Sequence, residues 1–123
     1  MKRDLDLIRE ILLTIENDTS NRLSLHSFTS DPKQFPIISF HLELLLDAGF
    51  IVAKPLKALG QRYTDFYIQR LTNSGCDYLD SVRDNNIWNK TKDKLLSVGG
   101  SATLDIVKTV AIGITKTALG ITI

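Results

Sequence analysis

The chain has 123 residues, of which 43% are hydrophobic, and its formal net charge is +1. These values predict one domain with an apolar core, and they exclude wholesale disorder and a strongly basic nucleic-acid-binding arm. The single cysteine, Cys76, has no partner for an internal disulfide, and acids stand near the N-terminus where a secretion signal is apolar. We therefore expect a cytoplasmic protein.

The C-terminal stretch 104–123 is apolar, but Asp105, Lys108 and Lys116 interrupt it. A membrane-spanning helix needs about 20 largely uncharged residues. We therefore expect no integral membrane segment, and contact of this stretch with a membrane surface stays open as an alternative.

Apolar side chains at helical spacing predict a first helix over residues 3–17, and the turn-forming run at 17–21 ends it. Residues 22–28 alternate apolar and polar side chains, which indicates a short, half-buried strand. Between Pro32 and Pro36 there is room for a single helical turn. The full second helix of an ordinary helix-turn-helix is therefore not expected.

The next helix is predicted over residues 36–48. It ends at Gly49, because glycine adopts the left-handed conformation of a helix end without a Cβ penalty. Residues 50–56 and 62–71 are rich in β-branched and aromatic side chains and predict the two strands of a hairpin. A helix followed by a hairpin is the arrangement of the recognition helix and the wing in a winged-helix domain.

Three helices are expected after the hairpin. Thr72 or Asn73 is expected to cap the first, residues 84–86 to recap the chain before the second, and Ser101 to cap the last. The last helix has one apolar arc, which consists of Leu104, Val107, Val110, Ala111, Ile114 and Ala118.

These elements together predict an α+β fold. Residues 1–84 are expected to form a winged helix-turn-helix-like domain. Residues 85–123 are expected to form a two-helix C-terminal extension that serves packing or oligomerisation.

Four stretches of the sequence resemble known families. Residues 41–51, HLELLLDAGFI, resemble the end of recognition helices in bacterial winged-helix regulators, and residues 70–79, RLTNSGCDYL, resemble the step that leads out of their wing. Residues 1–13, MKRDLDLIREILL, and 79–92, LDSVRDNNIWNKTK, resemble the DUF2513 family of uncharacterised bacterial and prophage proteins. The second resemblance extends over nearly the whole chain. Together they imply a winged-helix regulatory protein of bacterial or prophage type, without an assigned activity.

The helix over residues 36–48 has two different faces. Ile38, Leu42 and Leu45 are expected in the core, whereas Glu43 and Asp47 on the outer face would repel phosphates. Contacts to duplex DNA are therefore expected from polar and basic residues around the helix start and the hairpin. These residues are Lys33, Ser39, His41, Lys54, Lys57 and Arg62. Solvated surface charge is the alternative interpretation of the basic ones.

Apolar side chains on the outer face favour a different partner. Phe40 and Leu44, which acids flank, suit a protein contact better than a DNA groove. The last helix is a second expected contact, through Val107 and Ile114, and packing within the chain is its alternative. Duplex DNA and a protein partner, including a second copy of the chain as a homodimer, are therefore two competing hypotheses.

The sequence has no pattern typical of catalysis or metal binding. His26, His41 and Cys76 are not at metal-ligand spacing, and no glycine-rich phosphate loop follows a strand. His41 falls within an apolar arc, which favours a buried structural histidine over a base, and Cys76 is expected as a packed thiol. We therefore expect a non-enzymatic protein with no cofactor, no metal and no small-molecule substrate.

Overall fold

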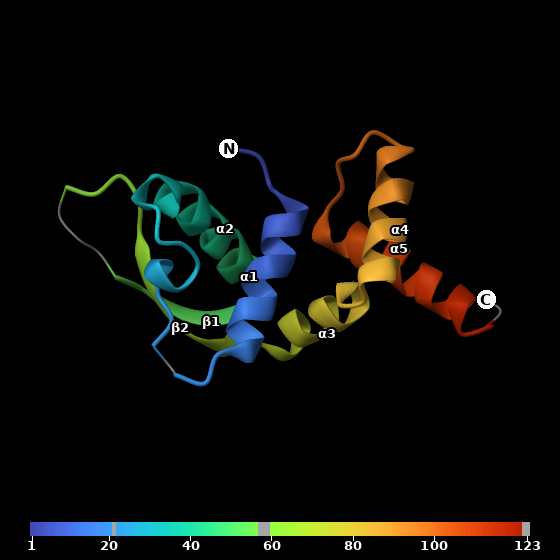
Figure 1. The fold of residues 1–123 in the computed structure, drawn as a ribbon, viewed down its shortest axis with the longest axis horizontal. Coiled ribbons are helices and arrows are strands. Elements are labelled where there is room, and N and C mark those ends of the chain that lie inside the picture. Colours follow the sequence, from blue (N-terminus) through green and yellow to red (C-terminus); the bar gives the residue numbers. More distant parts are fainter. Residues whose placement is uncertain (21, 57–59, 122–123) are drawn as a thin grey trace. The chain divides into compact units, whose positions relative to one another are not determined.

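The computed structural model of the chain describes residues 1–20, 22–56 and 60–121. Over these residues it contains five α-helices and a two-stranded antiparallel sheet, which confirms the expected α+β class (Figure 1). The chain divides into two compact units, Met1–Cys76 and Asp77–Ile123. This division lies inside the third helix, earlier in the chain than the one expected between residues 84 and 85.

The first helix, α1 (Leu5–Asn17), begins at Asp4, whose carboxylate accepts a hydrogen bond from the Leu7 backbone N–H at 3.1 Å. Such a cap satisfies one backbone donor and places a negative charge at the positive end of the helix. The predicted helix is confirmed, although it starts two residues later than expected. Its buried stripe consists of Ile8, Ile11, Leu12 and Ile15.

The strand predicted over residues 22–28 is wrong in its extent. Of the described residues in this stretch, Leu23 alone pairs with the sheet, where its carbonyl accepts a hydrogen bond from the Ile68 N–H at 3.0 Å. The chain then forms a short 3₁₀ helix (Leu25–Ser27). The carboxylate of Asp65 accepts a hydrogen bond from the first N–H of this turn at 3.1 Å. The Asp65 side chain thus uses a backbone N–H that a longer strand would donate to its neighbouring strand.

Helix α2 (Phe35–Asp47) follows a second 3₁₀ turn, Pro32–Gln34, as the spacing of the prolines predicts. Its inner face is at most 5% exposed at the three expected core positions, which are Ile38, Leu42 and Leu45. The helix also ends where expected. Gly49 has a φ of +74°, a left-handed conformation that a residue with a Cβ adopts only at a cost.

Strands β1 (Ile51–Leu56) and β2 (Asp65–Leu71) form the predicted antiparallel hairpin. Phe66 and Ile68 are buried, and both α1 and α2 contact the hairpin (Figure 1). Lys54 and Tyr67 lie opposite one another on the two strands and are exposed. One face of the hairpin is therefore covered by helices, and the other faces solvent.

Helix α3 (Asn73–Val82) begins directly after β2. The backbone of its first turn lies close to the backbone at Phe50. The Thr72 hydroxyl oxygen accepts a hydrogen bond from the Gly75 N–H at 3.1 Å and donates one to the Gly49 carbonyl, so the expected cap is confirmed. A Cβ on Gly75 would lie 2.1 Å from the Phe50 carbonyl oxygen. Glycine is therefore required at this position, because any larger residue would displace the backbone.

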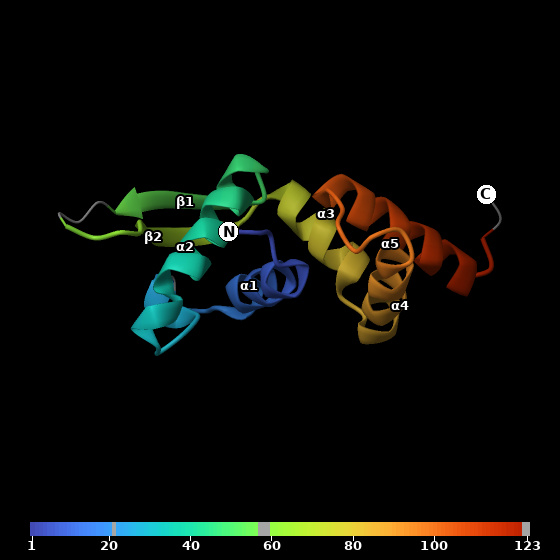
Figure 2. The ribbon, with the colours of Figure 1, turned by 90° about the horizontal axis from the view of Figure 1, so that it is seen from above.

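In the second unit, α4 (Asn85–Leu96) and α5 (Leu104–Ala118) pack side by side (Figure 2). The Asp84 carboxylate caps α4 by accepting a hydrogen bond from the Ile87 N–H at 2.9 Å. The cap of α5 is Thr103 and not Ser101, so that prediction is wrong by two residues. The buried side chains of the two helices are Trp88, Thr91, Leu95, Val107 and Ala111.

None of the helices in the described ranges combines the length and the apolar character that crossing a membrane requires.

Candidate functional site

Three aromatic rings from three separate segments meet at the N-terminal end of α2. The Phe35 ring packs edge-to-face against His26, with centroids 4.8 Å apart, and against Tyr63, with centroids 5.7 Å apart. Phe35 is buried, Tyr63 is half-buried and His26 is exposed. Edge-to-face contacts of this kind hold rings in a defined geometry. The start of α2, the 3₁₀ helix Leu25–Ser27 and the segment entering β2 are therefore joined at one point.

A pair of hydrogen bonds strengthens this junction one turn further along α2. The Ser39 hydroxyl donates to the Thr64 carbonyl at 2.6 Å and accepts from the Thr64 N–H at 3.1 Å. Ser39 is only 3% exposed, and both functions of its hydroxyl are used. We therefore remove Ser39 from the predicted DNA-contacting residues, because its side chain does not reach the surface.

Two of the predicted cationic residues lie beside this junction. Lys33 stands two residues before Phe35, and Arg62 stands one residue before Tyr63; both cations are exposed. The ring contacts thus bring together two segments that are far apart in the sequence, and each of them carries one of these cations. We call His26, Lys33, Phe35, Arg62 and Tyr63 together the α2 corner. One acid is close by, because the Asp31 carboxylate accepts a hydrogen bond from the Lys33 backbone N–H at 3.0 Å.

The remaining basic residues of the predicted set have different positions. Lys54 is exposed on the outer face of the hairpin, opposite Tyr67. Lys57 lies outside the described residues. The α2 corner therefore contains Lys33 and Arg62, and Lys54 stands apart from it on β1.

His41 is a structural residue and not a surface one. Its side chain is 0% exposed, Nε2 accepts a hydrogen bond from the Asp4 N–H at 2.8 Å, and Nδ1 lies 2.7 Å from the Ile37 carbonyl. Since Nε2 acts as an acceptor, Nδ1 carries the proton and donates it to that carbonyl. The interpretation as a buried structural histidine is confirmed, and we remove His41 from the predicted DNA contacts.

The outer face of α2 combines acids with partly covered apolar groups. Glu43 and Asp47 are exposed, whereas Phe40 and Leu44 are half-buried. The Phe40 ring packs edge-to-face against the imidazole of His41, with centroids 5.3 Å apart. This face retains the apolar surface that suits a protein contact, and its charge opposes a phosphate backbone.

The two residues predicted for protein contact on the last helix differ in their burial. Val107 is 0% exposed, so its assignment to an interaction surface is wrong; it belongs to the core of the second unit. Ile114 is half-buried and lines a groove between α4 and α5. A helical wheel shows one apolar arc but does not show which part of it the neighbouring helix covers.

Cys76 also differs from expectation, because the thiol predicted to be packed belongs to an exposed residue. Among the residues that the structure describes, no three His, Cys, Asp or Glu side chains are arranged to hold a metal ion.

Comparisons with known proteins identify the family of the chain. The family model described as "Hypothetical protein (DUF2513)" matches residues 2–101. An "Uncharacterized protein" of Haemophilus influenzae is 35% identical over 113 residues, which cover 90% of this chain and 92% of the relative. The chain therefore belongs to the DUF2513 family, as the resemblance predicts. No solved structure matches the chain.

Proposed function

We propose that the first unit is a winged helix and that the protein is a non-enzymatic regulator that binds duplex DNA. The order α1, the Leu23 bridge, α2, the hairpin and α3 is that of a winged helix, with 3₁₀ turns in place of the second helix. Helix α2 then corresponds to the recognition helix and the hairpin to the wing. The assignment rests on this order of elements and on the two sequence stretches that resemble winged-helix regulators.

The observation that carries the DNA-binding proposal is the α2 corner. Lys33 and Arg62 come from different segments, and the contacts of Phe35 and Ser39 hold these segments together. Two exposed cations therefore stand at the N-terminal end of a 13-residue helix. The backbone dipoles of a helix favour a negative charge at that end.

The same geometry argues for phosphate contact with little reading of bases. Glu43 and Asp47 are exposed on the second half of α2, and a DNA backbone along that half would meet like charge. Phosphate contacts position a protein on the duplex, whereas base contacts specify the sequence. We therefore expect binding that is weak, strongly salt-dependent and similar for duplexes of different sequence.

The proposal is tested by the fluorescence anisotropy of a labelled duplex titrated with the full chain at low salt. The double variant Lys33→Glu/Arg62→Glu is expected to weaken binding by about tenfold or more, because it replaces two attractions by repulsions. The matched control is Lys90→Glu/Lys108→Glu, which makes the same change of charge in the second unit. Equal loss in both double variants, or no binding by the wild-type chain at low salt, would overturn the proposal.

A second candidate function, a protein-interaction module, is favoured by the outer face of α2. Phe40 and Leu44 remain partly exposed on the same face of α2 as Glu43 and Asp47, and apolar groups beside acids are typical of a protein contact. If this face joins two copies of the chain, sedimentation is expected to show concentration-dependent association that Phe40→Asp abolishes. Leu56→Asp, on the exposed part of the hairpin, is the control. A wild-type chain that stays monomeric would contradict the homodimer version.

A further inference from the structure

The second unit contains a groove that the DNA-binding proposal does not use. It runs between α4 and α5, and α5 contributes Val110, Gly113, Ile114 and Ala118 to its lining, while α4 contributes Lys90 and Lys94. All of these residues belong to the second unit. The groove is therefore defined by two helices that pack directly on one another.

The floor of this α4–α5 groove is apolar and open. Val110 and Ile114 are half-buried, although the positions between and beside them on α5, Val107 and Ala111, are fully buried. A Cβ built on Gly113 would meet no atom within 4 Å. At this glycine, a side chain from outside is free to approach the α5 backbone. The lining from Val110 to Ala118 spans about 12 Å at the rise of an α-helix, or a little more than two turns.

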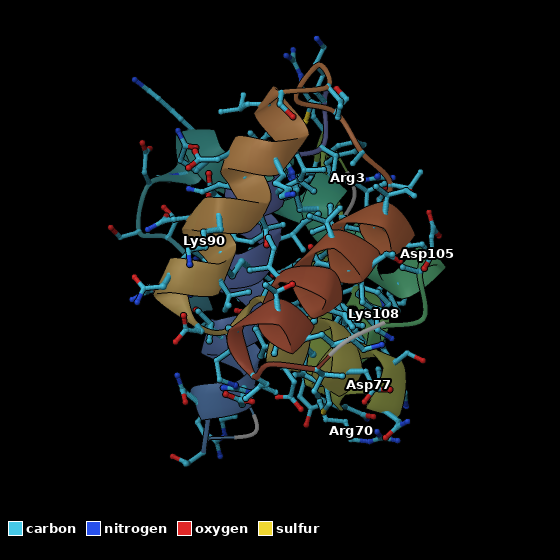
Figure 3. All side chains as sticks on the ribbon, turned by 90° about the vertical axis from the view of Figure 1, so that its right-hand side faces the viewer. Arg3, Arg70, Asp77, Lys90, Asp105 and Lys108 are labelled. Carbon is cyan, nitrogen blue, oxygen red and sulfur yellow. The ribbon has the colours of Figure 1, made fainter. Side chains whose placement is uncertain are left out.

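The wall of the groove on α4 is basic. Lys90 and Lys94 stand four residues apart, which places them on the same side of the helix, and both are exposed. Asp93 also lines the groove and offsets one of the two charges, so the wall carries a net positive charge. Figure 3 shows Lys90 projecting from α4, whereas Asp105 and Lys108 lie on the opposite side of the helix pair.

We propose that the α4–α5 groove binds an amphipathic α-helix of a partner protein, with its apolar stripe on α5 and acidic residues facing Lys90 and Lys94. An open groove with an apolar floor accepts side chains at the i, i+3 and i+7 positions of a helix. The pair of lysines selects acidic residues one turn apart along that helix. Gly113 provides the space for the central apolar side chain of the partner.

This inference uses residues of the second unit alone and is independent of the DNA-binding proposal. Its test is a selection from displayed random peptides of about four helical turns on the full-length chain. We expect the selected peptides to show apolar residues at helical spacing with Asp or Glu along one flank. Each enriched peptide is then synthesised, and its affinity for the chain is measured by fluorescence anisotropy.

Two variants of the groove and one matched control define the expected result. Lys90→Glu/Lys94→Glu is expected to weaken peptide binding by about tenfold or more, because attraction becomes repulsion. Gly113→Leu is expected to abolish binding, because its side chain fills the open centre of the floor. Lys108→Glu/Lys116→Glu, which reverses the same number of charges outside the groove lining, is expected to leave binding unchanged. Circular dichroism confirms in each case that the helices persist.

Several outcomes would overturn the proposal. Selected peptides without an acidic bias, or peptides that bind the Gly113→Leu variant as well as the wild type, contradict a helix seated in this groove. Sedimentation of the wild-type chain as a dimer that Gly113→Leu converts to a monomer would assign the groove to a second copy. Binding to phosphatidylglycerol vesicles that Gly113→Leu abolishes would assign it to a lipid surface.

Discussion

The two units differ in how their polar side chains are used. In the first unit, buried polar groups form hydrogen bonds between residues far apart in the sequence: His41 with Asp4 over 37 residues, and Ser39 with Thr64 over 25. In the second unit, the hydroxyls of several threonines donate to the carbonyl four residues earlier in the same helix. Examples are Thr91, Thr109 and Thr115. Long-range bonds position one segment against another, whereas bonds within one helix do not.

Most of the large apolar side chains that are exposed belong to the second unit. Leu96, Val98, Ile106, Leu119 and Ile121 are each at least 51% exposed, and all belong to the second unit. In the larger first unit the exposed large apolar side chains are Met1, at 77%, Leu56, at 47%, and Tyr67, at 38%. The first unit therefore leaves few large apolar side chains exposed, whereas the smaller second unit leaves more.

The largest effect that distinguishes the units is expected from truncation of a core leucine. Leu42→Ala removes a side chain that is 0% exposed and should lower the free energy of unfolding by about 2–5 kcal/mol. Ile114→Ala, at the half-buried floor of the α4–α5 groove, should cost much less. Urea unfolding followed by far-UV circular dichroism measures both. Equal losses would contradict the contrast between a closed core and an open groove.

Two glycine-to-alanine substitutions should change the free energy of unfolding in opposite directions. In Gly75→Ala the new Cβ would overlap the Phe50 carbonyl oxygen at 2.1 Å, so the backbone must shift, and we expect a loss of about 1–3 kcal/mol in stability. In Gly113→Ala the Cβ enters open space, and removal of a glycine from a helix interior should add about 1 kcal/mol. Thermal unfolding of the two variants measures the contrast. A gain at Gly75 would be inconsistent with the close approach of the two backbones.

A smaller effect is expected from the loss of the buried imidazole. His41→Leu leaves the Asp4 N–H without its acceptor, and the loss of one hydrogen bond costs about 0.5–1.5 kcal/mol. His26→Leu, at the exposed histidine of the α2 corner, should cost less than about 1 kcal/mol, because an exposed site loses little. Urea unfolding of both variants shows which substitution causes the larger loss of stability. A larger loss at His26 would show that the hydrogen bond to Asp4 contributes little.

Much of this architecture was predictable from the sequence, because local chemistry determines it. Helix α2 follows from the spacing of Ile38, Leu42 and Leu45 between a proline and Gly49, and the hairpin follows from β-branched and aromatic residues. The cap at Thr72 is likewise a local signal. In each case the residues that produce the element lie within it or next to it.

The candidate site was less predictable, because distant partners determine it. Ser39 lies on the outer side of a helical wheel anchored at Ile38, Leu42 and Leu45, yet it is buried, since Thr64 covers it and uses both functions of its hydroxyl. The strand predicted over residues 22–28 does not extend past Leu23, because the Asp65 carboxylate accepts the hydrogen bond of the Leu25 N–H. Periodicity contains no information about contacts of this kind. The position of Arg62 near the start of α2 depends on such contacts as well.

The central claim, that the α2 corner contacts phosphate, is tested most directly by the salt dependence of duplex binding. We predict that the logarithm of the binding constant falls linearly with the logarithm of salt concentration, and that Lys33→Ala or Arg62→Ala each reduces the slope by about one. Lys90→Ala should leave the slope unchanged. A slope that neither α2-corner variant alters, or that Lys90→Ala alters equally, would contradict the claim.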